Sequence, residues 1–149
     1  MQSVSSHPLS LLAAALLFAA ASTSVLAENS CARVSTFDVA SRSDNLFQAV
    51  LISVDGKLPG PTNADSWRIK PGTHTLAVAE AIDSNRFSAI SNRARDGSQG
   101  NRYKELTLVA EAGMTYRLAA RFHPDKDNQV RSGGYWEPVI WASSAEACS

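Results

Sequence analysis

The sequence predicts an all-β fold, a single antiparallel β-sandwich of about seven strands. Several segments alternate apolar and polar residues with a period of two, which is typical of strands that bury one face. Turn residues recur between these segments, and no long segment has the pattern of an amphipathic helix. Short strands separated by such turns favour a sandwich, and a small β-barrel is the alternative.

The first predicted strands are short and rich in β-branched residues. Residues 34–39 form one of them. In the next, Val50, Ile52 and Val54 alternate and are expected to face the core, and Asp55-Gly56 ends the strand.

Two β-hairpins are predicted from their turns. An alternating segment that begins at Trp67 leads into Pro71-Gly72, where Pro fixes φ for a type II turn and Gly accepts a positive φ. Residues 104–111 and 115–122 also alternate, and the turn between them places Gly113 at a positive φ. The face of 115–122 predicted to be buried consists of Tyr116, Leu118, Ala120 and Phe122.

The last predicted strand covers residues 137–142. Pro138 has no N–H to donate, so this strand is expected at a sheet edge or beginning after the proline. Residues 83–101 and 123–134 are polar and interrupted by Gly, Asn and Ser, which predicts two long surface loops.

The N-terminus has the pattern of an export signal. A short apolar run ends in small residues, which predicts a signal peptide over residues 1–27, with cleavage after Ala27. The run is shorter than the roughly 20 apolar residues that span a bilayer, so no transmembrane segment is expected after cleavage. Residues 28–149 then form one β-sandwich domain in the periplasm or outside the cell.

The only two cysteines, Cys31 and Cys148, bracket this domain. Export permits a disulfide, and two cysteines allow one intramolecular pairing. A structural disulfide between them is expected to contribute about 2 to 4 kcal/mol. A redox pair would need close spacing, which these residues lack.

Composition and motifs favour a protein without enzymatic activity. Fourteen basic and fourteen acidic residues give a net charge of zero, which argues against nucleic acid as a partner. No hydrolase motif, phosphate-binding loop or dinucleotide fingerprint is present, so no catalytic residue and no cofactor is predicted.

Two motif regions resemble known proteins. Residues 52–57 and 67–78 resemble the PEGA-like and transthyretin-like sandwich modules of bacterial envelope proteins, in which a strand ending in Asp-Gly precedes a Pro-Gly hairpin. Residues 113–120 and 135–141 are similar to small exported Gram-negative proteins of unknown function. The resemblance implies a sandwich fold, an envelope location and an accessory or interaction role.

Four residues are candidates for contact with a partner. Arg86, Arg93 and Arg95 make residues 86–104 locally basic, which suits anionic envelope polymers or an acidic protein. Trp136 would suit stacking on sugars or anchoring a partner. The alternative for both is ordinary: charged residues on a solvated face, and an aromatic residue in the core.

Residues 123–134 also raise the question of calcium, because Asp125, Asp127 and Gln129 place oxygens at alternate positions. The glycine and the distal glutamate of an EF-hand are missing, so no metal ligand is predicted. We therefore expect a periplasmic accessory or binding module for an unknown envelope protein or polymer. The alternatives are an inhibitor of an exogenous lysozyme or protease, and an unrecognised metal-dependent enzyme.

Overall fold

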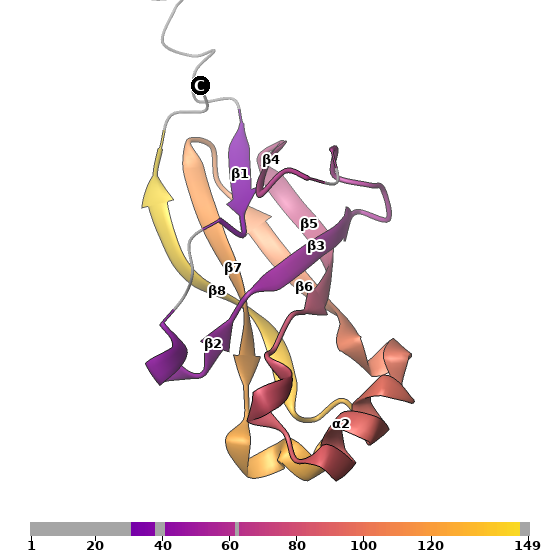
Figure 1. Ribbon diagram of the computed structural model, residues 1–149. Helices are drawn as coiled ribbons and strands as arrows, with labels where there is room; N and C mark the ends of the chain where they lie inside the picture. Colours follow the sequence, from indigo (N-terminus) through magenta and orange to yellow (C-terminus); the bar gives the residue numbers. More distant parts are fainter. Residues whose placement is uncertain (1–30, 38–40, 62, 147–149) are drawn as a thin grey trace, which may run out of the picture.

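The computed structural model describes residues 31–37, 41–61 and 63–146, which form two β-sheets without a closed barrel (Figure 1). The predicted all-β, sandwich-like fold is confirmed, and the described residues contain eight strands. The larger sheet contains β1 (Ala32–Ser35), β2 (Leu46–Phe47), β4 (Ser66–Ile69), β7 (Met114–Phe122) and β8 (Trp136–Ala145). The smaller sheet contains β3 (Ala49–Val54), β5 (Gly72–Glu80) and β6 (Tyr103–Ala110).

Strand β7 is the centre of the larger sheet. β8 pairs with it along one side, while β1 and β2 share the other side, β1 at residues 115–117 and β2 at residues 120–121. The β1–β7 pair is parallel, which departs from the fully antiparallel sandwich that was predicted. β4 pairs with β1 and forms an outer edge, and the smaller sheet is antiparallel in the order β3-β5-β6.

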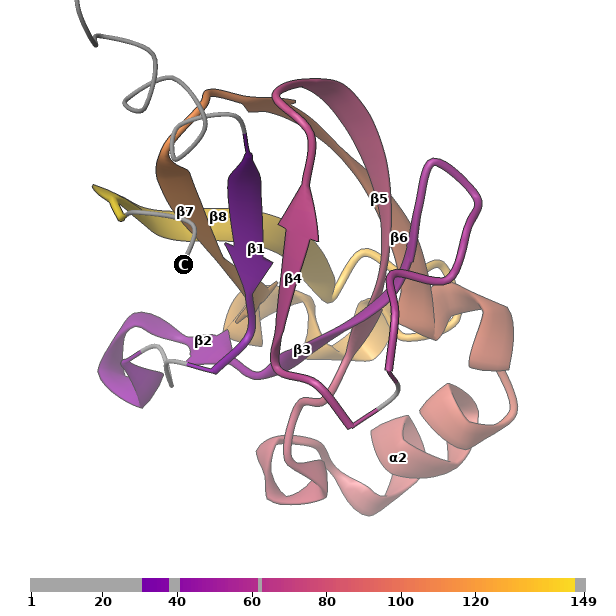
Figure 2. The ribbon, with the colours of Figure 1, turned by 90° about the horizontal axis from the view of Figure 1, so that it is seen from above.

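Both predicted hairpins are wrong. β4 pairs with β1, and β5 pairs with β3 and β6, so the Pro71-Gly72 turn carries the chain from one sheet to the other. The turn at Gly113 likewise joins β6 of the smaller sheet to β7 of the larger one (Figure 2). Gly72 and Gly113 do have the predicted positive φ, at 134° and 74°. Alternation of apolar and polar residues reveals which face of a strand is buried, but it does not reveal the strand's partner. Two consecutive strands that face one core from opposite sheets therefore have the same sequence pattern as the two strands of a hairpin.

The core lies between the two sheets. The predicted buried face of β7 is confirmed, since Tyr116, Leu118, Ala120 and Phe122 are all buried. In β3 the predicted face is wrong, because Ala49 and Leu51 are buried while Val50 is 46% exposed. A register shift between Leu51 and Ser53 then brings Val54 partly against the core. Side chains on both sides of this β-bulge can therefore contact the core.

Residues 83–101 do not form the predicted surface loop. They contain η2 (Ser84–Arg86), α2 (Ala89–Asp96) and most of η3 (Gln99–Arg102). The Ser88 hydroxyl caps α2 by accepting a hydrogen bond from Ser91 N, at 3.1 Å. Phe87 is buried against the rings of Phe122 and Tyr135, so this segment covers one end of the core.

Two further short helices are η1 (Arg42–Asp44) and η4 (Pro124–Gln129), the second within the other predicted loop. Among the described strands, β8 pairs only with β7, and it contains Pro138, which confirms the predicted edge position. Within the part of the chain that the structure describes, no helix has the length and apolar character needed to cross a membrane. The predicted signal peptide, residues 1–27, lies outside the described residues.

The predicted disulfide stays a prediction, because Cys148 lies outside the described residues. The backbone near it nevertheless approaches Cys31. Gly113 N donates to Cys31 O at 2.8 Å, and Glu146 N donates to Gly113 O at 2.9 Å.

Candidate binding groove

Two of the four candidate contact residues are buried. The side chain of Arg95 is only 7% exposed, and it donates to both oxygens of Glu80, from Nε at 2.7 Å and Nη2 at 2.6 Å. Trp136 is 1% exposed, and its indole N–H donates to Asn101 O at 2.9 Å. Neither side chain is therefore presented at the surface. The position of Trp136 matches the alternative interpretation, that of an aromatic residue in the core.

The other two candidates, Arg86 and Arg93, are exposed. The Arg86 guanidinium lies 5.2 Å from the centre of the Phe47 ring, a cation–π contact near the end of the core. Arg93 is exposed on α2. The locally basic segment thus combines an interior residue, Arg95, with two surface residues.

Glu80 organises the covered end of the core. Its carboxylate is fully buried and accepts hydrogen bonds from Arg95, from Arg102 Nε at 3.1 Å, from Tyr135 Oη at 3.0 Å and from Ile82 N at 2.7 Å. Burial alone would raise the pKa of Glu80, but the bonds from Arg95 and Ile82 more than offset it and hold the pKa below its ordinary value. Glu80 is therefore an anion whose partners tie α2, η3 and the residue before β8 to β5.

The region considered for calcium does not gather ligands. Asp125 and Asp127 lie in η4, and His123 Nε2 lies 3.7 Å from Glu137 Oε1. No group of three His, Cys, Asp or Glu side chains that could hold a metal ion exists among residues 31–37, 41–61 and 63–146.

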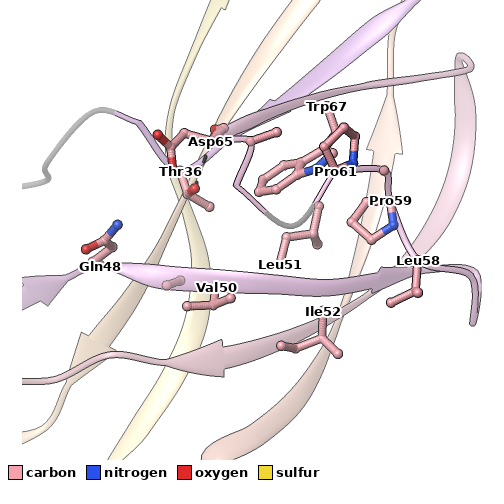
Figure 3. Close-up of a pocket in the computed structure, with 13 residues that line it drawn as sticks. Thr36, Gln48, Val50, Leu51, Ile52, Leu58, Pro59, Pro61, Asp65 and Trp67 are labelled. Atoms are coloured by element: carbon pink, nitrogen blue, oxygen red, sulfur yellow. Dashed lines mark hydrogen bonds between the residues drawn. The ribbon is translucent and has the colours of Figure 1, made fainter.

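A groove opens instead along β3, between that strand and the segment from Leu58 to Trp67 (Figure 3). Its volume is about 330 Å³, near the lower end of the range for small-ligand sites. Most of its lining is apolar. The lining residues are Thr36, Gln48, Ala49, Val50, Leu51, Ile52, Leu58, Pro59, Gly60, Pro61, Ala64, Asp65 and Trp67.

Trp67 forms part of the wall of the groove. The residue is 7% exposed, and its Nε1 atom is buried without a hydrogen-bond partner among the described residues. A Cβ atom added at Gly60 would lie 3.5 Å from Trp67 Cδ1, so the backbone at Gly60 rests close to the indole. A buried donor without an acceptor costs about 1 to 3 kcal/mol. Leu58, at the rim, is 79% exposed.

The groove runs along the free edge of β3. β3 pairs with β5 on one side and with no other described strand. Near its end, Val54 and Lys57 exchange two backbone hydrogen bonds, of 2.9 and 3.0 Å, while the next residue, Asp55, donates to Thr75 on β5. Alternate residues of a strand direct their backbone groups to opposite edges. Lys57 therefore occupies the outer edge of β3 at Val54, whereas Ala49 and Leu51, earlier in the strand, are only 1% and 4% exposed.

A basic hollow of about 210 Å³ adjoins the groove and shares Leu58 and Pro59 with it. Lys57, Arg68 and Lys70 line this hollow. None of these three cations forms an ion pair with another residue that the structure describes.

His74 lies in the wall of the same hollow and is held in place on both sides. Its Nδ1 lies 2.7 Å from Asp55 Oδ2, and its Nε2 lies 2.7 Å from Lys70 O. The Asp55 carboxylate and the Lys70 carbonyl both accept from the ring and raise the pKa of His74. The hydrogen bond from Thr75 N, followed by that from His74, lowers the pKa of Asp55. The pair is therefore an ion pair in mildly acidic solution.

Sequence reasoning identified Trp67 as a strand residue but missed the groove. One local signal existed: Leu58-Pro59-Gly60-Pro61 is an apolar stretch inside a turn-rich connection, where polar residues are usual. This stretch lines a groove only because Leu51 and Trp67 lie near it in space. A pattern within one segment of sequence does not reveal such proximity.

The geometry defines a class: a β-sandwich with an apolar groove beside an edge strand and a basic hollow next to the groove. Comparison with protein families, with curated protein sequences and with solved structures finds no match to this chain. The resemblance to PEGA-like and transthyretin-like modules therefore stays a prediction.

Proposed function

We propose that this chain is an exported, non-enzymatic accessory module that binds another component of the bacterial envelope, and that the β3 groove is its binding site. One observation carries the proposal: a mostly apolar groove of about 330 Å³ lies beside β3, and a hollow lined by Lys57, Arg68 and Lys70 adjoins it. Apolar sites with a few directed polar groups are typical of binding sites.

The lining supports binding over catalysis. Among the described residues that line the groove, Asp65 has the only ionisable side chain, so these residues place no acid–base pair there. The His74–Asp55 pair in the basic hollow resembles two members of a catalytic triad. However, His74 Nε2, the atom that would take a proton from a nucleophile, already bonds to Lys70 O.

The inhibitor hypothesis has less support. It relied on the basic segment 86–104, and the structure directs Arg95 of that segment to Glu80 in the interior. Exposed Arg93 alone gives no observation that favours a hydrolase as partner.

Site-specific photo-crosslinking tests the proposal. A photoreactive amino acid is placed at Leu58, on the rim of the groove, and in a second version at Val109, which is 66% exposed on β6. In living bacteria we expect one reproducible adduct from position 58 and none from position 109. Val50→Asp, which places a charge in the lining, should abolish that adduct. Equal adducts from both positions, or none from position 58, would refute the proposal.

A further inference from the structure

We infer that the binding site takes a single amphiphile, with a phosphate head group in the basic hollow and an apolar chain in the β3 groove. This inference rests on the proposed function and names the class of ligand. It is carried by three features: the wall that the two cavities share, the surplus of positive charge in the hollow, and the different character of the two ends of the groove.

The groove and the hollow share one wall. Leu58 and Pro59 line both cavities, so a ligand that lies across these two residues has one part in each cavity. The hollow, at about 210 Å³, is below the roughly 300 Å³ at which small-molecule sites begin, and it therefore suits a single head group. The larger groove, at about 330 Å³, suits the apolar part of the same molecule.

The groove presents apolar side chains that a ligand can reach. Val50 and Leu58 are 46% and 79% exposed, and Ile52 and Pro59 are partly exposed. An apolar chain needs contact with such side chains only, and it requires no hydrogen bond from the buried backbone of β3. Each methylene transferred from water to this surface should tighten binding about two- to fourfold, since the open groove leaves one side of the chain in water.

The hollow has a surplus of positive charge. Lys57, Arg68 and Lys70 line it, all three are exposed, and no acidic side chain is among the described residues of its lining. A phosphate monoester has a charge of about −1.5 to −2 near pH 7 and several oxygens that accept hydrogen bonds. Such a head group balances three cations better than a carboxylate does, and the Arg68 guanidinium can donate two parallel hydrogen bonds to it.

His74 fixes the shape of the hollow before a ligand binds. Its ring lies between two acceptors, with Nδ1 2.7 Å from Asp55 Oδ2 and Nε2 2.7 Å from Lys70 O. These contacts connect the segments that follow β3 and β4, so the backbone that carries Lys57 and Lys70 is held in place. The other oxygen of Asp55 accepts from Thr75 N at 2.9 Å, and the charge of Lys57 is the smallest of the influences that lower the pKa of Asp55. Lys57 is therefore available to a bound anion.

The two ends of the groove set the direction of the amphiphile. Thr36, Gln48 and Asp65 lie toward the end away from Leu58 (Figure 3). The Asp65 carboxylate would repel a phosphate at that end, so the head group belongs in the hollow. A chain that starts in the hollow meets apolar side chains first and these polar ones last. Affinity should therefore rise with chain length and level off when the chain reaches the polar residues.

The experiment titrates the purified protein at pH 7 with butyl, hexyl, octyl and decyl phosphate, each below the concentration at which it forms micelles. Binding is measured by isothermal titration calorimetry. We expect affinity to rise about two- to fourfold per methylene and then to level off. Octyl phosphate should bind at least tenfold more tightly than octanoate or octanol.

Two variants separate the head group from the chain. Arg68→Gln should weaken octyl phosphate about tenfold and leave the gain per methylene unchanged, and Arg93→Gln, which removes an exposed arginine of α2, is its matched control. Val50→Ser should reduce the gain per methylene. Val109→Ser, at a position 66% exposed on β6, is the control for that change. Neither control should alter binding.

Three results would overturn the inference. Octanoate or octanol that binds as tightly as octyl phosphate would exclude the phosphate head group, and affinity that does not depend on chain length would exclude the chain. Binding to vesicles of phosphatidylglycerol without binding to any monomeric alkyl phosphate would assign a membrane surface in place of a single amphiphile. If none of these probes binds while the adduct at position 58 persists, the amphiphile class is wrong and the proposed function stands.

Discussion

The buried ion pair between Glu80 and Arg95 gives the sharpest stability prediction. Arg95→Ala removes the two hydrogen bonds of 2.7 and 2.6 Å from a carboxylate that has no solvent exposure. Loss of one partner from a buried pair costs about 3 to 5 kcal/mol, because the remaining charge stays buried. Arg102 Nε, at 3.1 Å, still neutralises part of that charge, so the lower end of the range is expected.

This magnitude can be converted to a melting temperature. A domain of this size loses about 4 °C for each kcal/mol, so Arg95→Ala should melt about 12 °C below the parent protein. The measurement is urea denaturation followed by tryptophan fluorescence, with thermal melting by circular dichroism beside it. Arg93→Ala is the matched control, since it removes an exposed arginine from the same helix and should cost less than about 0.5 kcal/mol.

Two results would refute the reasoning. One is a loss below about 1 kcal/mol for Arg95→Ala, and the other is an equal loss for Arg93→Ala. A cycle with Glu80→Gln adds a further check, since two directly bonded residues should show a coupling energy of about 1 to 3 kcal/mol.

Three other predictions concern the basic hollow, the two cysteines and the turn at Gly113. His74 bonds to Asp55 and has a pKa raised above 6.5, so its contribution to stability should be complete below pH 6.5 and decline as pH rises through the raised value. His74→Gln should remove this dependence in urea denaturation at pH 6 and pH 9, and an unchanged dependence would show that another group titrates. Intact mass without reductant should show the Cys31–Cys148 disulfide, and reduction should lower stability by about 2 to 4 kcal/mol; two free thiols would contradict the pairing. Gly113→Ala should cost about 1 to 2 kcal/mol because φ there is 74°, and calorimetry showing no loss would mean that the turn relaxes.

Alternation predicted the fold where it was unambiguous. In residues 115–122 polar residues separate several of the apolar ones, so the buried face of β7 was identified correctly. In β3, Ala49 to Ile52 is a continuous apolar run, and such a run does not say which face is buried. Strand partners were predicted wrongly for a related reason, since sequence neighbours were expected to pair and both turns instead join different sheets.

The helical segment was missed because its stability comes from distant residues. Ala89–Asp96 contains Ser, Asn and Asp, which are weak helix formers. The helix is stabilised by the Ser88 cap and by the ion pair between Arg95 and Glu80. One signal was readable: the alternation of β5 places Glu80 on the same face as Val78, and a buried carboxylate requires a cation. The basic segment that follows was the place to look for it.

The position of β1 has a consequence for the order of folding. The chain is synthesised from its N-terminus, but β1 pairs with the distant strand β7, where Arg33 lies opposite Thr115. β8, which follows later still, pairs with the other side of β7. The larger sheet is therefore unfinished until nearly the whole chain is available. Sheets built from such distant pairings fold slowly, on the order of milliseconds to seconds. A partial chain should consequently remain unfolded, a state in which a polypeptide can pass through a narrow channel before its sheets close.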